Sequence, residues 1–464
     1  MNNVLIKVFC ISLLFVFTDS LFAQEEQVAK EDTNTLVHFL KRGKFDGHAR
    51  TFFMSTINEG KLSDYYALAT GAGIGYHTAE WKGLSAGMSG FFIFNIASSD
   101  LNKTDSISNQ KNRYEIGLFD ITNTDNKFDL DRMEELNIKY RIQSTKLIVG
   151  RQFISTPFIN KQDGRMRSTI VQGIYLQSKI KNNWTVDAGW LTRISPRTTV
   201  SWFSVGESIG IYAPGVNTDG TKSEYPGNTT SKGIAIGGIQ FKKKLVHMQV
   251  WNTYVDNIMN TVLLQSELRF PANKKNKFVA GVQYVYQNST GNGGNSEVSK
   301  RYYEKGSHTT VMASRLGYET LIWKTNINYL HISNDARFLM PREWGREPFY
   351  TFLARERNEG LGGVNAWTFN NEFVTKNKQW KLGLSYGQYY TPDPDNFRLN
   401  KYGLPSYHQL NASADYNFKG FLKNMNIQLL LVWKGVLKNE PVAVKYLFNR
   451  VNMLNSNLVV NYNF

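Results

Sequence analysis

The chain has 464 residues and a formal net charge of +16. No segment beyond its N-terminus reaches about 18 uninterrupted apolar residues, which excludes a protein that crosses membranes with helices. Its single cysteine, Cys10, lies in an N-terminal apolar run, so disulfides and thiolate metal sites are excluded from the rest of the chain.

The first 23 residues have the pattern of a secretory signal peptide. Lys7 precedes the apolar run 8–17, and the small residue Ala23 is followed by polar Gln24, so cleavage after Ala23 is predicted. The run is shorter than the roughly 20 residues of a bilayer-spanning helix. Residues 24–44 are expected to form a flexible periplasmic segment. Because the chain is exported, nucleic acid is the least expected partner for its positive charge.

From residue 45 onward, apolar and polar residues alternate with period two. In 261–270, for example, Val262, Leu264 and Leu268 alternate with Gln265 and Glu267, which is the pattern of a transmembrane strand with a lipid face and a lumen face. Nineteen segments fit: 45–57, 65–78, 84–97, 112–123, 136–143, 145–154, 170–180, 184–192, 233–241, 245–258, 261–270, 278–287, 308–318, 322–332, 366–374, 380–390, 409–418, 425–434 and 455–464.

These segments predict an all-β fold, a transmembrane antiparallel β-barrel over residues 45–464. Single-chain bacterial barrels have even strand numbers, so one of the nineteen segments is expected to be wrong or one strand to be missed, which gives about 18 strands. A barrel of this size is too wide for its wall side chains to fill. No helix longer than one or two turns is expected.

The last strand ends on an aromatic residue of its apolar face. Leu458, Val460, Tyr462 and Phe464 alternate with a face that is nearly all asparagine. A soluble strand packed on a core could show the same alternation. The terminal aromatic favours an outer-membrane barrel, in which Phe464 and Tyr462 would be read by the barrel assembly machinery.

The predicted connections differ sharply in length. Residues 181–183 and 242–244 are short turns, whereas 98–111, 155–169, 193–232, 288–307, 333–365 and 391–408 are long and rich in Gly, Pro, Asn and Ser. Short periplasmic turns and long external loops are typical of outer-membrane barrels.

Two patterns that suggest chemistry have structural explanations. Gly83-Leu84-Ser85-Ala86-Gly87 fits a nucleophile elbow, but that motif needs a helix after the serine, and a strand pattern follows Ser85 instead. The seven histidines are scattered singly, without the spacing of a metal site. No catalytic residue, metal or cofactor is therefore predicted.

The most informative stretch is Gly150-Arg151-Gln152, then Thr156-Pro157, Asp163-Gly164-Arg165-Met166-Arg167 and Gln172-Gly173. If this loop folds into the barrel, its arginines would narrow and charge the lumen and favour carboxylates. The alternative is a solvated external loop with arginines on lipid phosphates. Arg151 shares a strand face with Leu147 and Val149, so it belongs to the rim unless a bulge near Gly150 re-aims it.

This stretch resembles the OprD-type outer-membrane porins, and Trp344-Gly345-Arg346-Glu347-Pro348 is similar to a later stretch in some members. The resemblance implies an 18-stranded barrel, either a monomer or a homotrimer, in which an inward-folded third loop makes the constriction. It also implies a ladder of basic residues that guides small carboxylate-bearing solutes. By position, Arg151, Arg165 and Arg167 match the motif and its loop, and Arg50 and Arg346 are weaker assignments.

The predicted function is passive diffusion of small hydrophilic solutes through an outer-membrane pore that prefers anions, with outer-membrane lipid as its surroundings. Two alternatives remain open. One is a barrel enzyme of the lipase or protease type. The other is an adhesion or binding protein that acts through its long loops, 193–232 above all.

Overall fold

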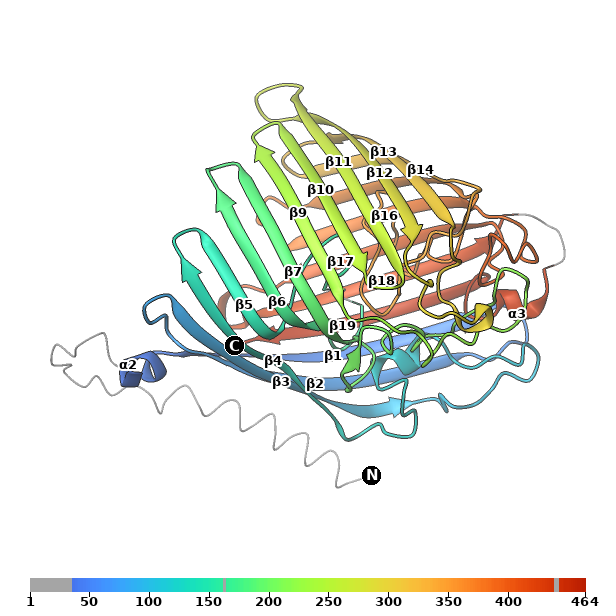
Figure 1. The fold of residues 1–464 in the computed structure, drawn as a ribbon, viewed down its shortest axis with the longest axis horizontal. Coiled ribbons are helices and arrows are strands. Elements are labelled where there is room, and N and C mark those ends of the chain that lie inside the picture. The colour runs from blue at the N-terminus through green and yellow to red at the C-terminus, as the bar shows by residue number, and fades with distance from the viewer. Residues whose placement is uncertain (1–35, 162–163, 438–441) are drawn as a thin grey trace.

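The computed structural model describes residues 36–161, 164–437 and 442–464, and the predicted signal peptide lies outside these ranges. The chain forms one antiparallel sheet of 19 strands whose first and last strands pair (Figure 1). Eighteen strands make the barrel wall, and β8 is a two-residue strand attached to β7. The fold predicted from the sequence is confirmed, including the even number of wall strands.

The strands are β1 (Lys44–Asn58), β2 (Tyr65–His77), β3 (Leu84–Ser98), β4 (Leu130–Ile142), β5 (Thr145–Gln152), β6 (Ile170–Ile180), β7 (Trp184–Ser195), β8 (Phe203–Ser204), β9 (Ile234–Lys243), β10 (Val246–Val255), β11 (Met259–Pro271), β12 (Lys277–Ser289), β13 (His308–Glu319), β14 (Trp323–Ile332), β15 (Asn365–Val374), β16 (Trp380–Tyr390), β17 (Tyr407–Asn417), β18 (Met425–Val436) and β19 (Met453–Asn463). The helical turns are α2 (Leu36–Lys41), η2 (Glu115–Leu118), η3 (Val298–Lys300), η4 (Gly420–Leu422) and α3 (Val444–Leu447). No helix in the described ranges is long and apolar enough to cross a membrane.

One of the nineteen predicted strands, 112–123, is wrong. Its centre is the short helix η2, buried inside the barrel against β1 and β2. The Asn112 side chain accepts from the Ile116 backbone N–H at 2.8 Å, and its amide donates to Glu115 at 2.6 Å. Residues Tyr114 to Phe119 are all buried. A segment covered on every side has no solvent face, so its apolar spacing did not distinguish a strand from an irregular buried turn.

The two faces of the wall follow the predicted alternation. Leu458 and Tyr462 of β19 and the next residue after the strand, Phe464, are exposed on the outside, whereas Asn455 and Asn457 of β19 are buried on the inside. The asparagines are satisfied there, since the amide of Asn457 donates to Asn455 at 2.8 Å and that of Asn455 donates to Thr56 at 2.9 Å. Polar wall residues therefore form a hydrogen-bonded inner surface, as expected for a lumen.

The connections separate by length, as predicted. Eight short turns at one end contain two to seven residues each, and most connections at the other end are long. One of those, 99–129, is longer than the sequence indicated, and another, 256–258, is short. The loops gather at the end of the barrel opposite the C-terminus (Figure 1). Their buried side chains, such as Leu118, Met166 and Trp344, pack in the barrel interior.

Candidate pore constriction

The connection 333–364 is held inside the barrel by the wall. Four side-chain donors on three wall strands, β12, β16 and β17, each reach one of its backbone carbonyls, at 2.7–2.9 Å: Gln287 to Leu339, Gln283 to Pro348, Tyr389 to Thr351 and Gln409 to Ala354. Each such bond satisfies a carbonyl that would otherwise be buried without a partner. This segment, which we call the inner loop, is therefore fixed to the wall.

Apolar packing adds to these hydrogen bonds. Phe338, Trp344 and Phe349 of the inner loop are buried in the main apolar cluster. The indole of Trp344 donates to Ser208 at 2.9 Å, which joins the inner loop to the connection 196–233. Burial of each ring stabilises the folded protein by roughly 2–3 kcal/mol. A solvated external loop would leave these rings in water and would lack this stabilisation.

The connection 153–169 also lies inside and meets the inner loop. The Asn160 amide donates to the carbonyl of Arg346 at 2.9 Å, and the Arg346 backbone N–H donates back to Asn160 at 3.1 Å. The Thr169 hydroxyl donates to the carbonyl of Glu343 at 2.8 Å. The loop expected from the sequence to narrow the lumen therefore shares that position with the inner loop.

Where these connections meet, arginines from five of them come together. We call this group the arginine cluster: Arg113, Arg165, Arg197, Arg342, Arg355, Arg357 and Arg450. Arg113 is exposed to solvent, and Arg355, Arg357 and Arg450 are half-buried, as expected for side chains that face an aqueous space. Arg165 and Arg197 are buried.

The like charges of the arginine cluster act on one another. Burial lowers the pKa of Arg165, and the charges of Arg355 and Arg197 lower it further. Burial and the charge of Arg197 likewise lower the pKa of Arg357, to about 10. All these groups remain protonated at neutral pH, since a guanidinium does not lose its proton in that range. Concentrated positive charge of this kind attracts anions.

The carboxylates near the arginine cluster offset only part of its positive charge. Burial raises the pKa of Glu343, Glu347 and Glu115, and it raises that of Glu356 to about 8. Glu356 is therefore protonated and neutral at pH 7. The net charge around the lumen is accordingly more positive than the composition of the loops indicates.

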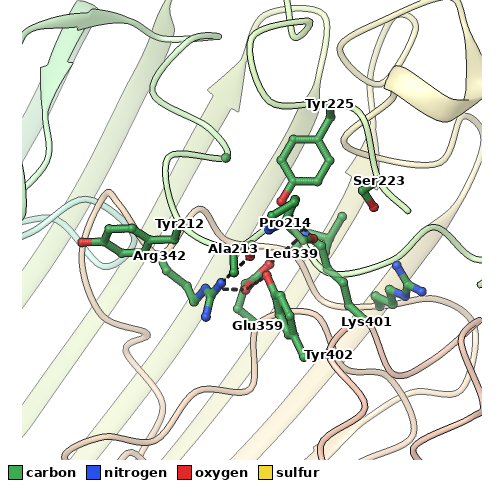
Figure 2. Close-up of polar contacts among 12 residues, drawn as sticks. Tyr212, Ala213, Pro214, Ser223, Tyr225, Leu339, Arg342, Glu359, Lys401 and Tyr402 are labelled. Atoms are coloured by element: carbon green, nitrogen blue, oxygen red, sulfur yellow. Dashed lines mark hydrogen bonds and ion pairs between the residues drawn. The ribbon is translucent and has the colours of Figure 1, made fainter. Parts of the chain in front are cut away.

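Ion pairs hold one side of the arginine cluster in place (Figure 2). The Arg342 guanidinium lies 3.4 Å from Glu359, and Lys401 lies 3.4 Å from the other oxygen of the same carboxylate. The Tyr402 hydroxyl donates to Glu359 at 2.8 Å, and Arg342 also stacks on the Tyr402 ring at 4.4 Å. Because Glu359 and Lys401 are both buried, their ion pair ties the inner loop to the connection 391–406.

A cavity of about 360 Å³ opens beside the loop 153–169. Arg50 of β1 and Arg167 line it, and the Arg50 guanidinium donates to the carbonyl of Arg165 at 2.8 Å. Asp46, Glu134 and Glu135 line it too. The charge of this cavity is mixed, unlike that of the arginine cluster.

The structure brings three of the five arginines chosen from the sequence together, namely Arg50, Arg165 and Arg167. Arg151 lies elsewhere. It pairs with Leu136, which is exposed on the outer face, and neither pairing of β5 shifts register at Gly150. Its guanidinium stacks on Trp202 at 4.7 Å, which places Arg151 at the outer rim.

Gly150 has a φ of 117°, and a Cβ there would lie 2.3 Å from the Leu136 carbonyl oxygen. The glycine is therefore required by the close approach of β4 rather than by a bulge. The fifth arginine, Arg346, is exposed on the inner loop and stacks on Phe352 at 5.7 Å.

Sequence reasoning missed six members of the arginine cluster, all except Arg165. A usable signal was present in 333–364, where Arg and Glu residues alternate with Phe338, Leu339, Trp344 and Phe349. Large apolar side chains in a loop indicate that the loop is buried, and arginines within it are then held inside the protein.

The chain is similar to a known protein family in sequence and to solved proteins in structure. The model of the outer membrane porin, OprD family, matches residues 95–342. Pseudomonas aeruginosa OccK9 (OpdG) is similar in structure, with a TM-score of 0.70 and 13% identity over 92% of this chain and 99% of that chain. Acinetobacter baumannii OccAB3 gives 0.72 and 13% over 92% and 100%. P. aeruginosa OpdK, solved with vanillate, gives 0.66 and 12% over 92% and 99%. No curated protein sequence matches the chain.

Proposed function

This chain belongs to the OprD family of outer membrane porins, and we propose that its pore favours small solutes that carry a carboxylate. Porins are channels rather than enzymes, and they pass small solutes across the outer membrane. Transport of this kind is diffusion down a gradient, without a chemical step.

The arginine cluster carries this proposal. A guanidinium presents paired N–H donors that match the two oxygens of a carboxylate, and five connections supply such groups to one region of the lumen. The similar barrel OpdK was crystallised with vanillate, which is an aromatic carboxylate. The half-buried tyrosines beside the arginines, Tyr212 and Tyr402, offer ring faces for a solute with an apolar part.

Conduction also requires that a solute leave. Arg342 is already engaged by Glu359 and Arg355 by the asparagines of β19, so these arginines do not offer their whole hydrogen-bonding capacity to a solute. Binding therefore stays weak enough for release.

The experiment that tests the proposal is single-channel recording in a planar bilayer, with the reversal potential measured under a salt gradient. We expect discrete conductance steps and an anion preference that weakens as salt rises, because salt screens the arginine charges. Micromolar to millimolar carboxylates should interrupt the current more than amines of the same size. Cation selectivity, or equal interruption by both solute classes, would contradict the proposal.

The anion preference should depend on pH between about 7 and 9. Neither oxygen of Glu356 has a hydrogen-bond donor among the described residues, and Lys434 is 3.8 Å away. Because its pKa is raised to about 8, Glu356 gains a negative charge as pH rises through 8. Burial lowers the pKa of Lys401 to about 8, so Lys401 loses positive charge over the same range.

Both changes weaken the attraction for anions, and a roughly twofold to fivefold fall in the anion-to-cation permeability ratio is expected from pH 7 to pH 9. Glu356→Gln should remove part of this fall, and Glu356→Gln with Lys401→Gln should remove most of it. Reversal potentials recorded at both pH values provide the check. A double variant that keeps the full pH dependence would show that other groups control it.

We also propose that residues 1–23 are cleaved during export and that the outward aromatics Tyr462 and Phe464 serve as the assembly signal. The intact mass of protein purified from the outer membrane should correspond to a chain that begins at Gln24. A mass that includes Lys7 would contradict cleavage at this site.

A further inference from the structure

The positive charge of this protein is concentrated at the short-turn end. The eight short turns contain nine lysines and one acidic residue, Glu80. The lysines are Lys82, Lys181, Lys244, Lys274, Lys275, Lys376, Lys378, Lys419 and Lys423. All nine are exposed. In the described parts of the chain, none of them forms an ion pair with a carboxylate.

The opposite end is almost neutral. Its nine connections contain 24 Lys and Arg residues against 23 Asp and Glu residues. The strand ends on this side of the barrel add further basic residues, against one acidic residue, Glu319, in the last two positions of each strand end: Lys44, Arg141, Lys146, Lys179, Lys242, Lys243, Lys277, Lys324 and Lys381. Solubility alone would not require the charge of +16 to be sorted so strongly to one end.

An aromatic belt lies directly above these lysines on the outer face. Cross-strand rings pair at centroid distances of 4.6–5.1 Å: Phe45 with Tyr76, Trp184 with Phe241, Phe278 with Tyr318, Trp323 with Phe373, and Trp380 with Tyr416. Such belts mark the boundary between hydrocarbon and head groups. Lys378 is two residues from Trp380, or about 7 Å of extended chain, which is close to the thickness of one head-group layer.

Two of the short turns also expose large apolar side chains. Phe421 is 93% exposed and lies between Lys419 and Lys423, and Leu321 is 75% exposed. An apolar side chain flanked by lysines is suited to a membrane surface, where the ring enters the interface and the ammonium groups contact phosphates. In a purely aqueous turn the same side chains would be unfavourable.

We infer that the short-turn end binds the anionic head groups of phospholipids in the periplasmic leaflet. Lysines occur in six of the eight turns, so the charge is distributed around the barrel's circumference. Lysines spread around the circumference can each contact a different lipid. A binding site for one soluble polyanion would instead gather its lysines in a single patch. Each lysine near an anionic surface strengthens binding by several-fold. This inference does not depend on which solutes the pore passes.

The test compares two variants with the same loss of charge. In the turn variant, six turn lysines are replaced by glutamine: Lys181, Lys244, Lys274, Lys275, Lys378 and Lys423. In the control variant, six exposed lysines of the opposite end are replaced by glutamine: Lys61, Lys103, Lys111, Lys222, Lys232 and Lys305. Both proteins are refolded and incubated with an equimolar mixture of phosphatidylglycerol and phosphatidylcholine, and the retained lipids are counted by native mass spectrometry.

We expect the unaltered protein and the control variant to retain phosphatidylglycerol preferentially, and the turn variant to show a preference at least about tenfold weaker. An equal loss in the control variant would show that net charge matters and its position does not, which would overturn the inference.

The unaltered protein provides a second readout that does not depend on how the variants fold. Its preference for phosphatidylglycerol should disappear at about 1 M salt, where the Debye length is about 3 Å. Soluble glycerol phosphate at the same phosphate concentration should not displace the lipid, because it lacks the membrane surface. No preference at low salt, or displacement by glycerol phosphate, would overturn the inference.

Discussion

Replacing Arg165 and Arg355 together with glutamine is expected to lower the anion-to-cation permeability ratio by roughly tenfold. Both arginines belong to the arginine cluster, and they lie close enough together that the charge of Arg355 lowers the pKa of Arg165. Two unit charges 4 Å apart interact by about 1 kcal/mol in water and about 4 kcal/mol near a protein surface. Loss of two positive charges therefore removes at least the 1.4 kcal/mol that corresponds to a factor of ten.

Reversal potentials under a salt gradient measure this ratio. The matched control is Arg301→Gln with Arg398→Gln, since these external arginines donate to backbone carbonyls and lie outside the arginine cluster. The control should retain the selectivity of the unaltered protein. Arg167→Gln should have a smaller effect, because Arg167 lines the cavity in which acidic residues are also present. If the double cluster variant keeps its selectivity, these arginines do not select the solute.

Excising most of the inner loop is expected to raise single-channel conductance several-fold. A barrel of this strand number leaves an aqueous channel unless something fills it, and the inner loop packs buried side chains there. The two ends of the inner loop lie side by side, so its middle can be removed without separating them. Phe338 and Leu361 are joined by an antiparallel bridge, and the Gly360 N–H donates to the Phe338 carbonyl at 2.7 Å. Replacing 340–359 with Asn-Gly should close this base as a two-residue hairpin.

The control for the excision is the replacement of residues 218–220 with Asn-Gly. These residues form the tip of an external hairpin closed by the bridge between Val216 and Lys222, so the conductance should stay unchanged. The current amplitude at fixed voltage is the measurement. A shortened inner loop that leaves conductance unaltered would mean that the narrowest point lies in the loop 153–169 instead.

The barrel wall could be predicted from the sequence because each strand carries its own signal. Period-two alternation is local, and burial on one face with lipid on the other enforces it along segments such as β11 and β19. The prediction of a strand at 112–123 was wrong because this alternation requires two different faces. Glu115 and Ile116 are both buried in the lumen, and a segment without an exposed face does not carry the signal.

The arginine cluster could not be predicted in the same way. Its members are separated by up to 337 positions, from Arg113 to Arg450, and they meet because five connections fold into one space. No local pattern encodes that meeting. The family resemblance identified Arg165 from its motif, and it also pointed to Arg151, which the register of β5 places at the rim.

The seam between β1 and β19 determines when this barrel is able to fold. Nearly every strand pairs with its neighbour in sequence, whereas Arg50 bonds to Asn461 across 411 positions. Contacts of such separation are slow to form, since a long chain must be ordered first. Until β19 arrives, the nascent sheet has two unpaired edges, which are prone to aggregation. A chain interrupted before β19 would therefore remain an open sheet rather than become a leaky pore.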